Sequence, residues 1–115
     1  MNVLFGSSIT ALTRGLTFAN QRHEVLAQNL ANVETPNYRA RDLVRDEPLD
    51  TTSDTPAPLP RVTYSGDGAS GIGGNDVDLE REMGRIAENT LLHHTRVQLL
   101  ASQFASLKQA ISGRV

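Results

Sequence analysis

Two segments at opposite ends of this chain repeat mostly apolar residues at steps that alternate between four and three. The first run consists of Phe5, Ile9, Leu12, Leu16, Ala19, His23, Leu26, Leu30 and Val33. The second run consists of Leu79, Met83, Ile86, Thr90, His93, Val97, Leu100, Phe104, Leu107 and Ile111. This spacing holds one row of side chains on a single helix face over many turns, as in coiled coils. The sequence therefore predicts two long helices, each packing one row, here called the seam, against the other.

The segment between the two runs has a different composition. All five prolines and five of the nine glycines lie within residues 33–75, and too few large apolar side chains remain there to form a core. We expect an N-terminal coiled-coil helix over residues 1–33, an irregular Pro/Gly-rich middle over residues 34–75 and a C-terminal coiled-coil helix over residues 76–115. The predicted fold class is all-α, an antiparallel two-helix coiled-coil hairpin whose irregular middle is partly β or disordered.

Local signals refine the ends of the two helices. Ser7 or Ser8 is expected to cap the start of the first helix, because a serine hydroxyl accepts a hydrogen bond from an unpaired amide there. Pro36 is expected to end this helix, since proline disfavours the helical conformation in the residue before it. Asn75 or Asp76 is expected to cap the second helix.

Within the middle segment, composition separates three stretches. Residues 39–49 are expected to be extended, and Arg61–Tyr64 resembles a short edge strand. Residues 50–60, rich in proline, threonine and aspartate, are expected to be flexible.

The two seams can be laid antiparallel so that the numbers of facing residues add to 116. Ala19 then faces Val97, and His23 faces His93 in a polar layer that would fix the alignment. A shift by one heptad keeps the same spacing, so the sequence leaves that register open as well.

A second apolar stripe lies outside the seams. Its members are Leu4, Ala11, Phe18 and Val25 on the first helix and Leu92 and Leu99 on the second. A helix needs one apolar face to form a hairpin, and a second apolar face favours contact with another subunit. The stripe is therefore predicted to pack against copies or relatives of the chain; isolated surface leucines are the alternative interpretation.

Composition excludes several kinds of function. The chain has no cysteine, hence no thiolate metal site or thiol nucleophile, and its net charge of −2 argues against nucleic acid as the main partner. Gly66–Gly71 matches a dinucleotide-binding string, but no βαβ unit fits around it. His93 and His94 are adjacent and so point about 100° apart on a helix, which disfavours joint metal binding. We expect no cofactor, metal or small-molecule substrate.

Acidic residues gather at the start of the second helix. Asp76, Asp78, Glu80 and Glu82 lie where their charge favours the positive end of the helix dipole, which accounts for them without catalysis. No nucleophile is paired with a base and an orienting group, so no enzyme is predicted.

A more specific pattern overlaps the end of the first seam. Residues 28–39 resemble the N-terminal signature of bacterial flagellar rod and hook proteins. The family motif is carried by Asn29, Leu30, Ala31, Asn32, Thr35, Pro36, Asn37 and Tyr38. Asn37 replaces the usual glycine and Arg39 a common lysine. Because asparagine tolerates the left-handed conformation, the turn after Pro36 is expected to be retained.

Length and the second helix narrow the resemblance within this family. The short chain is similar to the small proximal rod proteins, since hook and distal-rod members carry a larger inserted domain. Residues 75–83, 87–89 and 100–111 favour one of the two small rod proteins over the other, FlgC, which is the alternative assignment. The resemblance implies a structural subunit of the proximal rod of the flagellar basal body, in which the terminal helices form an inner coiled-coil layer that transmits torque.

The resemblance also implies partners and a route. The partners would be other copies of the chain, other flagellar rod proteins, the MS-ring and the FliE adaptor. The first residues lack the features of a secretory signal, which fits export to the periplasm-spanning rod by the flagellar type III export apparatus without a cleaved signal peptide. Phe5 and Ile9 resemble an export element, or are simply the first turn of the seam. The alternative function is a soluble helical adaptor or regulator in flagellar export.

Overall fold

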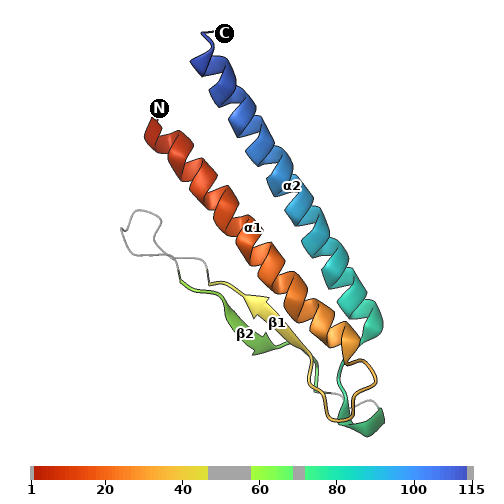
Figure 1. Cartoon of the computed structure of the whole chain (residues 1–115). Helices are drawn as coiled ribbons and strands as arrows, with labels where there is room; N and C mark the ends of the chain where they lie inside the picture. Colours follow the sequence, from red (N-terminus) through yellow and green to blue (C-terminus); the bar gives the residue numbers. More distant parts are fainter. Residues whose placement is uncertain (1, 47–57, 69–71, 114–115) are drawn as a thin grey trace. The chain divides into compact units, whose positions relative to one another are not determined.

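The computed structural model describes residues 2–46, 58–68 and 72–113 (Figure 1). Along the chain lie helix α1 (Asn2–Ala31), strand β1 (Arg41–Val44), strand β2 (Arg61–Tyr64), the short 3₁₀ turn η1 (Ile72–Gly74) and helix α2 (Leu79–Ile111). The two long helices pack together, and the strands between them in sequence form a small antiparallel hairpin. The predicted fold class is confirmed, with a middle that is partly β.

Both helix starts differ from the expected ones. Helix α1 begins at Asn2, so neither Ser7 nor Ser8 caps it; both lie inside the helix because nothing before them interrupts it. Helix α2 begins at Leu79, and its N-cap is Asp78, whose Oδ1 accepts the Arg81 N–H at 3.2 Å. The predicted caps, Ser7 or Ser8 for α1 and Asn75 or Asp76 for α2, were therefore wrong.

The chain divides into two compact units. The first contains the part of α1 up to Asn20 and the part of α2 from Ala87 onward. The second runs from Gln21 to Ile86 and holds the end of α1, both strands, η1 and the first turns of α2. The division of the sequence into residues 1–33, 34–75 and 76–115 stays a prediction.

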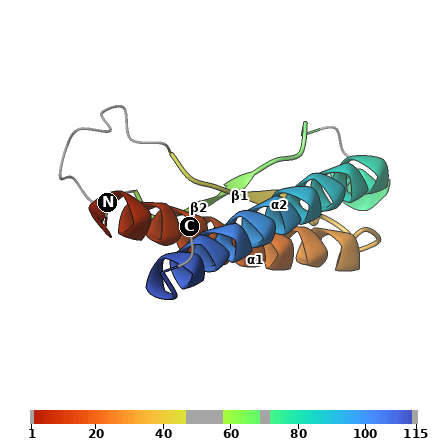
Figure 2. The same ribbon diagram turned by 90° about the horizontal axis from the view of Figure 1, so that it is seen from above.

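In the first unit the helices run side by side in opposite directions, so that the start of α1 and the end of α2 lie at the same end of the pair (Figures 1 and 2). Two contacts fix their alignment: Gly15 lies against Arg96, and Ala19 against Asn89. The residue numbers of these pairs add to 111 and 108. The register adding to 116 is therefore wrong, and with it the His23–His93 layer; the observed register is close to the one displaced by a heptad.

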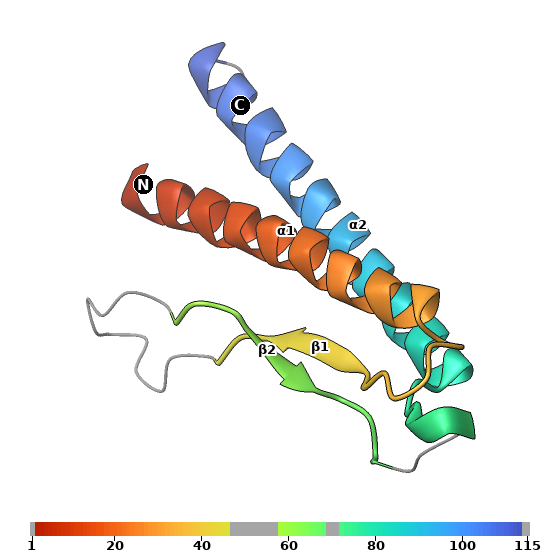
Figure 3. The same cartoon turned by 60° about the horizontal axis from the view of Figure 1, so that its bottom comes forward.

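In the second unit β1 lies between the end of α1 and β2 (Figures 1 and 3). The strands pair in register from Arg41 opposite Tyr64 to Val44 opposite Arg61. The edge strand predicted at Arg61–Tyr64 is confirmed, and β1 falls within the stretch expected to be extended. Residues 50–57 of the stretch expected to be flexible lie outside the described residues.

The small core of the second unit has an ion pair beside it. Leu26 of α1 is fully buried, as are Ala40 and most of Leu43 around β1. Arg22 of α1 donates two hydrogen bonds to the Asp42 carboxylate of β1, at 2.9 and 3.1 Å, with both side chains largely buried. The bidentate geometry fixes the strand against the helix.

None of the described helices is long and apolar enough to cross a membrane.

Candidate assembly surface and polar junction

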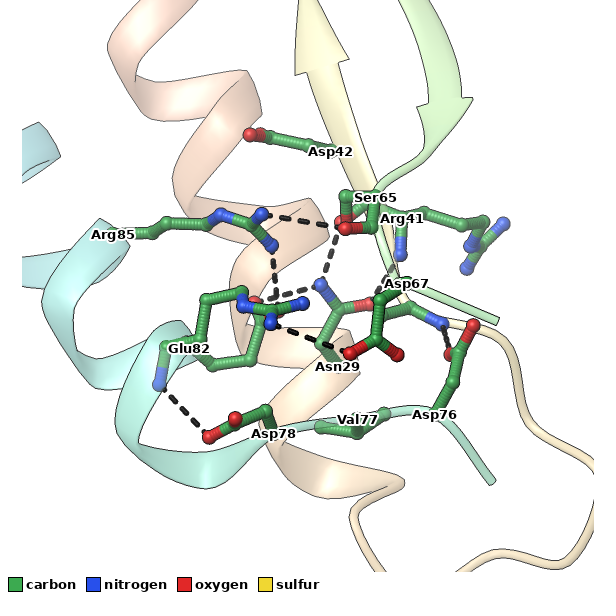
Figure 4. Close-up of polar contacts among 12 residues, drawn as sticks. Asn29, Arg41, Asp42, Ser65, Asp67, Asp76, Val77, Asp78, Glu82 and Arg85 are labelled. Atoms are coloured by element: carbon green, nitrogen blue, oxygen red, sulfur yellow. Dashed lines mark hydrogen bonds and ion pairs between the residues drawn. The ribbon is translucent and has the colours of Figure 1, made fainter. Parts of the chain in front are cut away.

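The end of α1 is held to β1 by one buried asparagine. Asn29 is fully buried, and its Oδ1 accepts the Arg41 N–H at 2.9 Å while its Nδ2 donates to the Arg41 carbonyl at 2.6 Å (Figure 4). A side-chain amide thus pairs with a strand residue as a neighbouring strand would. The Tyr38 hydroxyl also donates to Asn29 Oδ1, at 3.3 Å.

The same asparagine reaches the first turns of α2. Its Nδ2 donates to Glu82 Oε2 at 2.9 Å, and Arg85 donates to Glu82 Oε1 at 2.9 Å (Figure 4). Arg85 also donates to the carbonyl of Ser65, directly after β2, at 3.4 Å. Glu82 is only 1% exposed, so these two hydrogen bonds replace the water molecules that would stabilise an exposed carboxylate. The cluster of Asn29, Arg41, Glu82, Arg85 and Ser65, here called the polar junction, joins α1, α2 and both strands.

Asn75 and Asp76 form hydrogen bonds with the segment between α1 and β1 and do not cap α2. Asn75 Nδ2 donates to the carbonyls of Asn32 and Thr35, at 2.7 and 2.6 Å, just after the end of α1. Carbonyls at a helix C-terminus lack partners within the helix, and Asn75 supplies one. Asp76 Oδ1 accepts the Ala40 N–H at 2.6 Å, immediately before β1.

The turn after Pro36 has the expected backbone. Asn37 has a φ of 61°, in the left-handed region, and the Tyr38 N–H closes the turn onto the Thr35 carbonyl at 3.3 Å. The Asn37 N–H donates to the carbonyl of Gly73 in η1 at 2.6 Å. The motif segment therefore docks on the turn that precedes α2.

A glycine lies directly against the Asp76 carboxylate. A Cβ added to Gly66 would collide with that carboxylate, which holds Ala40. Gly66→Ala should therefore lower the free energy of unfolding by about 1–3 kcal/mol, measured by urea denaturation followed by circular dichroism. Gly84→Ala is the control: nothing lies within 4 Å of its Cβ, and alanine in place of a helical glycine should raise stability by roughly 1 kcal/mol. Equal changes in unfolding free energy for Gly66→Ala and Gly84→Ala would contradict the close contact between Gly66 and the Asp76 carboxylate.

The α2 surface packed against α1 in the first unit is partly polar. Asn89 is buried, and His93, Arg96, Leu100 and Gln103 are half-buried. Sequence reasoning missed the contributions of Asn89 and Arg96 because it followed the apolar row alone. The available signal was a polar row at seven-residue spacing: Glu82, Asn89, Arg96 and Gln103.

Two apolar rows of α2 stay exposed on either side of this packed surface. Val97 and Phe104 lie on one flank, and Leu92 and Leu99 on the other. From the helical repeat, the residues of each flank lie about 60–80° from the centre of the packed surface. We call these pairs the flanking rows.

The other predicted seam and stripe residues are placed as follows. On α1, Ala19 and Leu26 are buried, Ile9, Leu12, Leu16, Phe18, Val25 and Leu30 are half-buried, and Ala11 and His23 are exposed. On α2, Ile86, His93 and Leu100 are half-buried, whereas Met83, Thr90, Val97, Phe104, Leu107 and Ile111 are exposed. The side chains of Leu4 and Phe5 lie outside the described residues. The roles given to the seam, the stripe and the export element stay predictions.

Neither His nor carboxylate residues gather into a metal site in the part of the chain that the structure describes. The rings of His93 and His94 stand edge to face with their centroids 6.3 Å apart.

The comparisons with known proteins are consistent over nearly the whole chain. No family model matches it. It is 30% identical to the flagellar basal body rod protein FlgB of Bacillus subtilis, over 96% of this chain and 97% of that protein. It is 33% identical to the protein of the same name from Aquifex aeolicus, over 86% and 88% of the two chains. The Salmonella typhimurium protein of that name is 30% identical, over 85% and 88%.

Proposed function

The chain belongs to the FlgB family of flagellar basal body rod proteins, and we propose that it builds the proximal rod by packing the flanking rows of α2 against neighbouring subunits. The family is structural, its place is the basal body rod, and the chain is not an enzyme. The resemblance to flagellar rod proteins is confirmed by these relatives.

The observation that carries this proposal is the position of the flanking rows. Within one chain, α2 turns Asn89 and Arg96 toward α1 and leaves Val97, Phe104 and Leu99 more than 40% exposed. Rows of large apolar side chains on an exposed helix are stabilised when another surface covers them. Since the rows lie on both flanks of the packed surface, one hairpin offers contacts to two neighbours.

The neighbours we propose are copies of this chain and other rod proteins, with the MS-ring and the FliE adaptor at the rod base. Burial of apolar rows on both sides of each hairpin gives many interlocked contacts, which suits a shaft that transmits torque. We also propose delivery by the flagellar type III export apparatus, with Phe5 and Ile9 as its recognition element.

Fractionation of cells tests the proposal. A tagged copy of the chain, expressed from its own locus, should co-purify with hook–basal bodies after detergent extraction and remain with them through a density gradient. A soluble adaptor or regulator in flagellar export would stay in the cytosolic fraction instead. Recovery in the cytosol alone, with motile cells, would contradict the rod role.

A further inference from the structure

Heptad spacing alone does not determine how the two helices are aligned. Apolar side chains meet apolar side chains when α2 is displaced by seven residues along α1, as the two registers allowed by the sequence show. We propose that two side chains of α2 specify the register of the helix pair. Arg96 does so through its hydrogen bond to Gly15 of α1, and Asn89 through its hydrogen bond to Ala19.

Arg96 fits a gap that glycine creates. Its guanidinium donates to the Gly15 carbonyl at 3.2 Å, and a Cβ on Gly15 would come within 2.8 Å of Nε and 2.9 Å of Cδ. The positions one heptad before and after Gly15 are Ser8 and Arg22. Both of these residues carry a Cβ, which Gly15 lacks, so the arginine side chain can cross the helix at position 15 and reach a backbone carbonyl.

Asn89 uses a second small residue one turn further along α1. Its Nδ2 donates to the Ala19 carbonyl at 2.9 Å, with Asn89 3% and Ala19 1% exposed. One heptad before and after Ala19 are Leu12 and Leu26, whose larger side chains would cover the backbone. A buried amide without a hydrogen-bond partner is destabilising, so this contact penalises any displaced register.

In either displaced register, both Arg96 and Asn89 lose the contacts described above. In one direction Arg96 would face Arg22, a like charge, and Asn89 would face Leu26. In the other direction they would face Ser8 and Leu12. A polar residue in a helix interface specifies alignment because only one alignment satisfies it, even where an apolar residue would bind more strongly.

Spin-label distances can measure the register directly, because the chain has no cysteine of its own. Thr17 and Ser106 are exposed on α1 and α2, so Thr17→Cys and Ser106→Cys provide two labelling sites in the full chain. Displacement by one heptad moves α2 along α1 by about 10 Å. The labels are far enough apart along the helix axis for this displacement to appear as a second peak in a pulsed electron–electron distance distribution.

The test variant combines Asn89→Leu with Arg96→Met, which keeps helix-forming side chains of similar size. The matched control combines Gln98→Leu with Arg14→Met, which makes the same kinds of change at exposed positions. We expect one distance in the unaltered chain and in the control, and two distances about 10 Å apart in the test variant with its helical circular dichroism retained.

Three results would overturn the proposal. A single unaltered distance in the test variant would show that the apolar contacts, together with the Asn29–Glu82 hydrogen bond, hold the register without Arg96 and Asn89. A broad distribution in the unaltered chain would show that the register is not set within one chain. Loss of helical circular dichroism in the test variant and in both of its single changes would assign the two residues to folding rather than to register.

Discussion

Replacing Glu82 with alanine should lower the free energy of unfolding by about 3–5 kcal/mol, because the change leaves buried charged and polar groups without their partner. Arg85, whose side chain is 22% exposed, would lose the carboxylate that neutralises it, and Asn29 would lose one acceptor. The loss is a large part of the stability of a chain of this size. Urea denaturation followed by far-ultraviolet circular dichroism measures it.

Glu88→Ala is the matched control for Glu82→Ala. Glu88 lies on the same helix and is exposed, so its loss should change stability by no more than about 0.5 kcal/mol. Glu82→Gln separates the effect of charge from that of shape, because it keeps an acceptor for Asn29 but removes the charge opposite Arg85. Its loss of unfolding free energy should lie between the losses of Glu82→Ala and Glu88→Ala. If Glu82→Ala were no more destabilising than Glu88→Ala, the polar junction would not hold the fold.

Introducing aspartate at both Val97 and Phe104 should abolish rod assembly while leaving the isolated chain as helical as before. Both side chains are exposed within one chain, 42% and 53%, so a carboxylate there stays hydrated in the monomer. In the proposed assembly each carboxylate would be buried against a neighbour at a cost of several kcal/mol per ion, repeated in every copy. Swimming in soft agar and recovery of hook–basal bodies, both in a deletion strain, measure the effect.

The control places aspartate at the adjacent positions Gln98 and Ala105. Both are exposed and, from the helical repeat, lie on the side of α2 opposite the surface packed against α1. Cells that carry this control variant should swim and assemble rods normally. If the Val97 and Phe104 variant restored motility, or if both variants lost it equally, the flanking rows would not be the assembly surface.

Local patterns predicted the elements of this fold well. Alternating steps of four and three identified both helices, the Arg61–Tyr64 stretch was identified as a strand, and Asn37 takes the backbone conformation expected of a residue in place of glycine. Each of these features depends on residues close together in sequence. The same is true of the motif at the end of α1, whose resemblance pointed to the family.

The failures share a different cause. Glu82 was assigned to the helix dipole because its neighbours in sequence justify that role, yet its partner Asn29 is 53 residues away. Asn75 was expected to cap the helix that follows it, and instead caps the one that ended 44 residues earlier. The register depends on Arg96 and Asn89, which are polar and therefore not part of the apolar pattern. They bind backbone carbonyls of α1, and the spacing of residues in the sequence does not identify these acceptors.

The contacts that join the two helices also constrain when the fold can form. The hydrogen bonds from Asn29 to Glu82, from Asn89 to Ala19 and from Arg96 to Gly15 link residues 53, 70 and 81 positions apart. Helix α1 therefore has no partner helix until the last third of the chain is present, and closing such long loops carries an entropic cost before any contact forms. A chain delivered one end first, whether from a ribosome or through a narrow channel, stays unpaired along its leading helix until its trailing helix arrives.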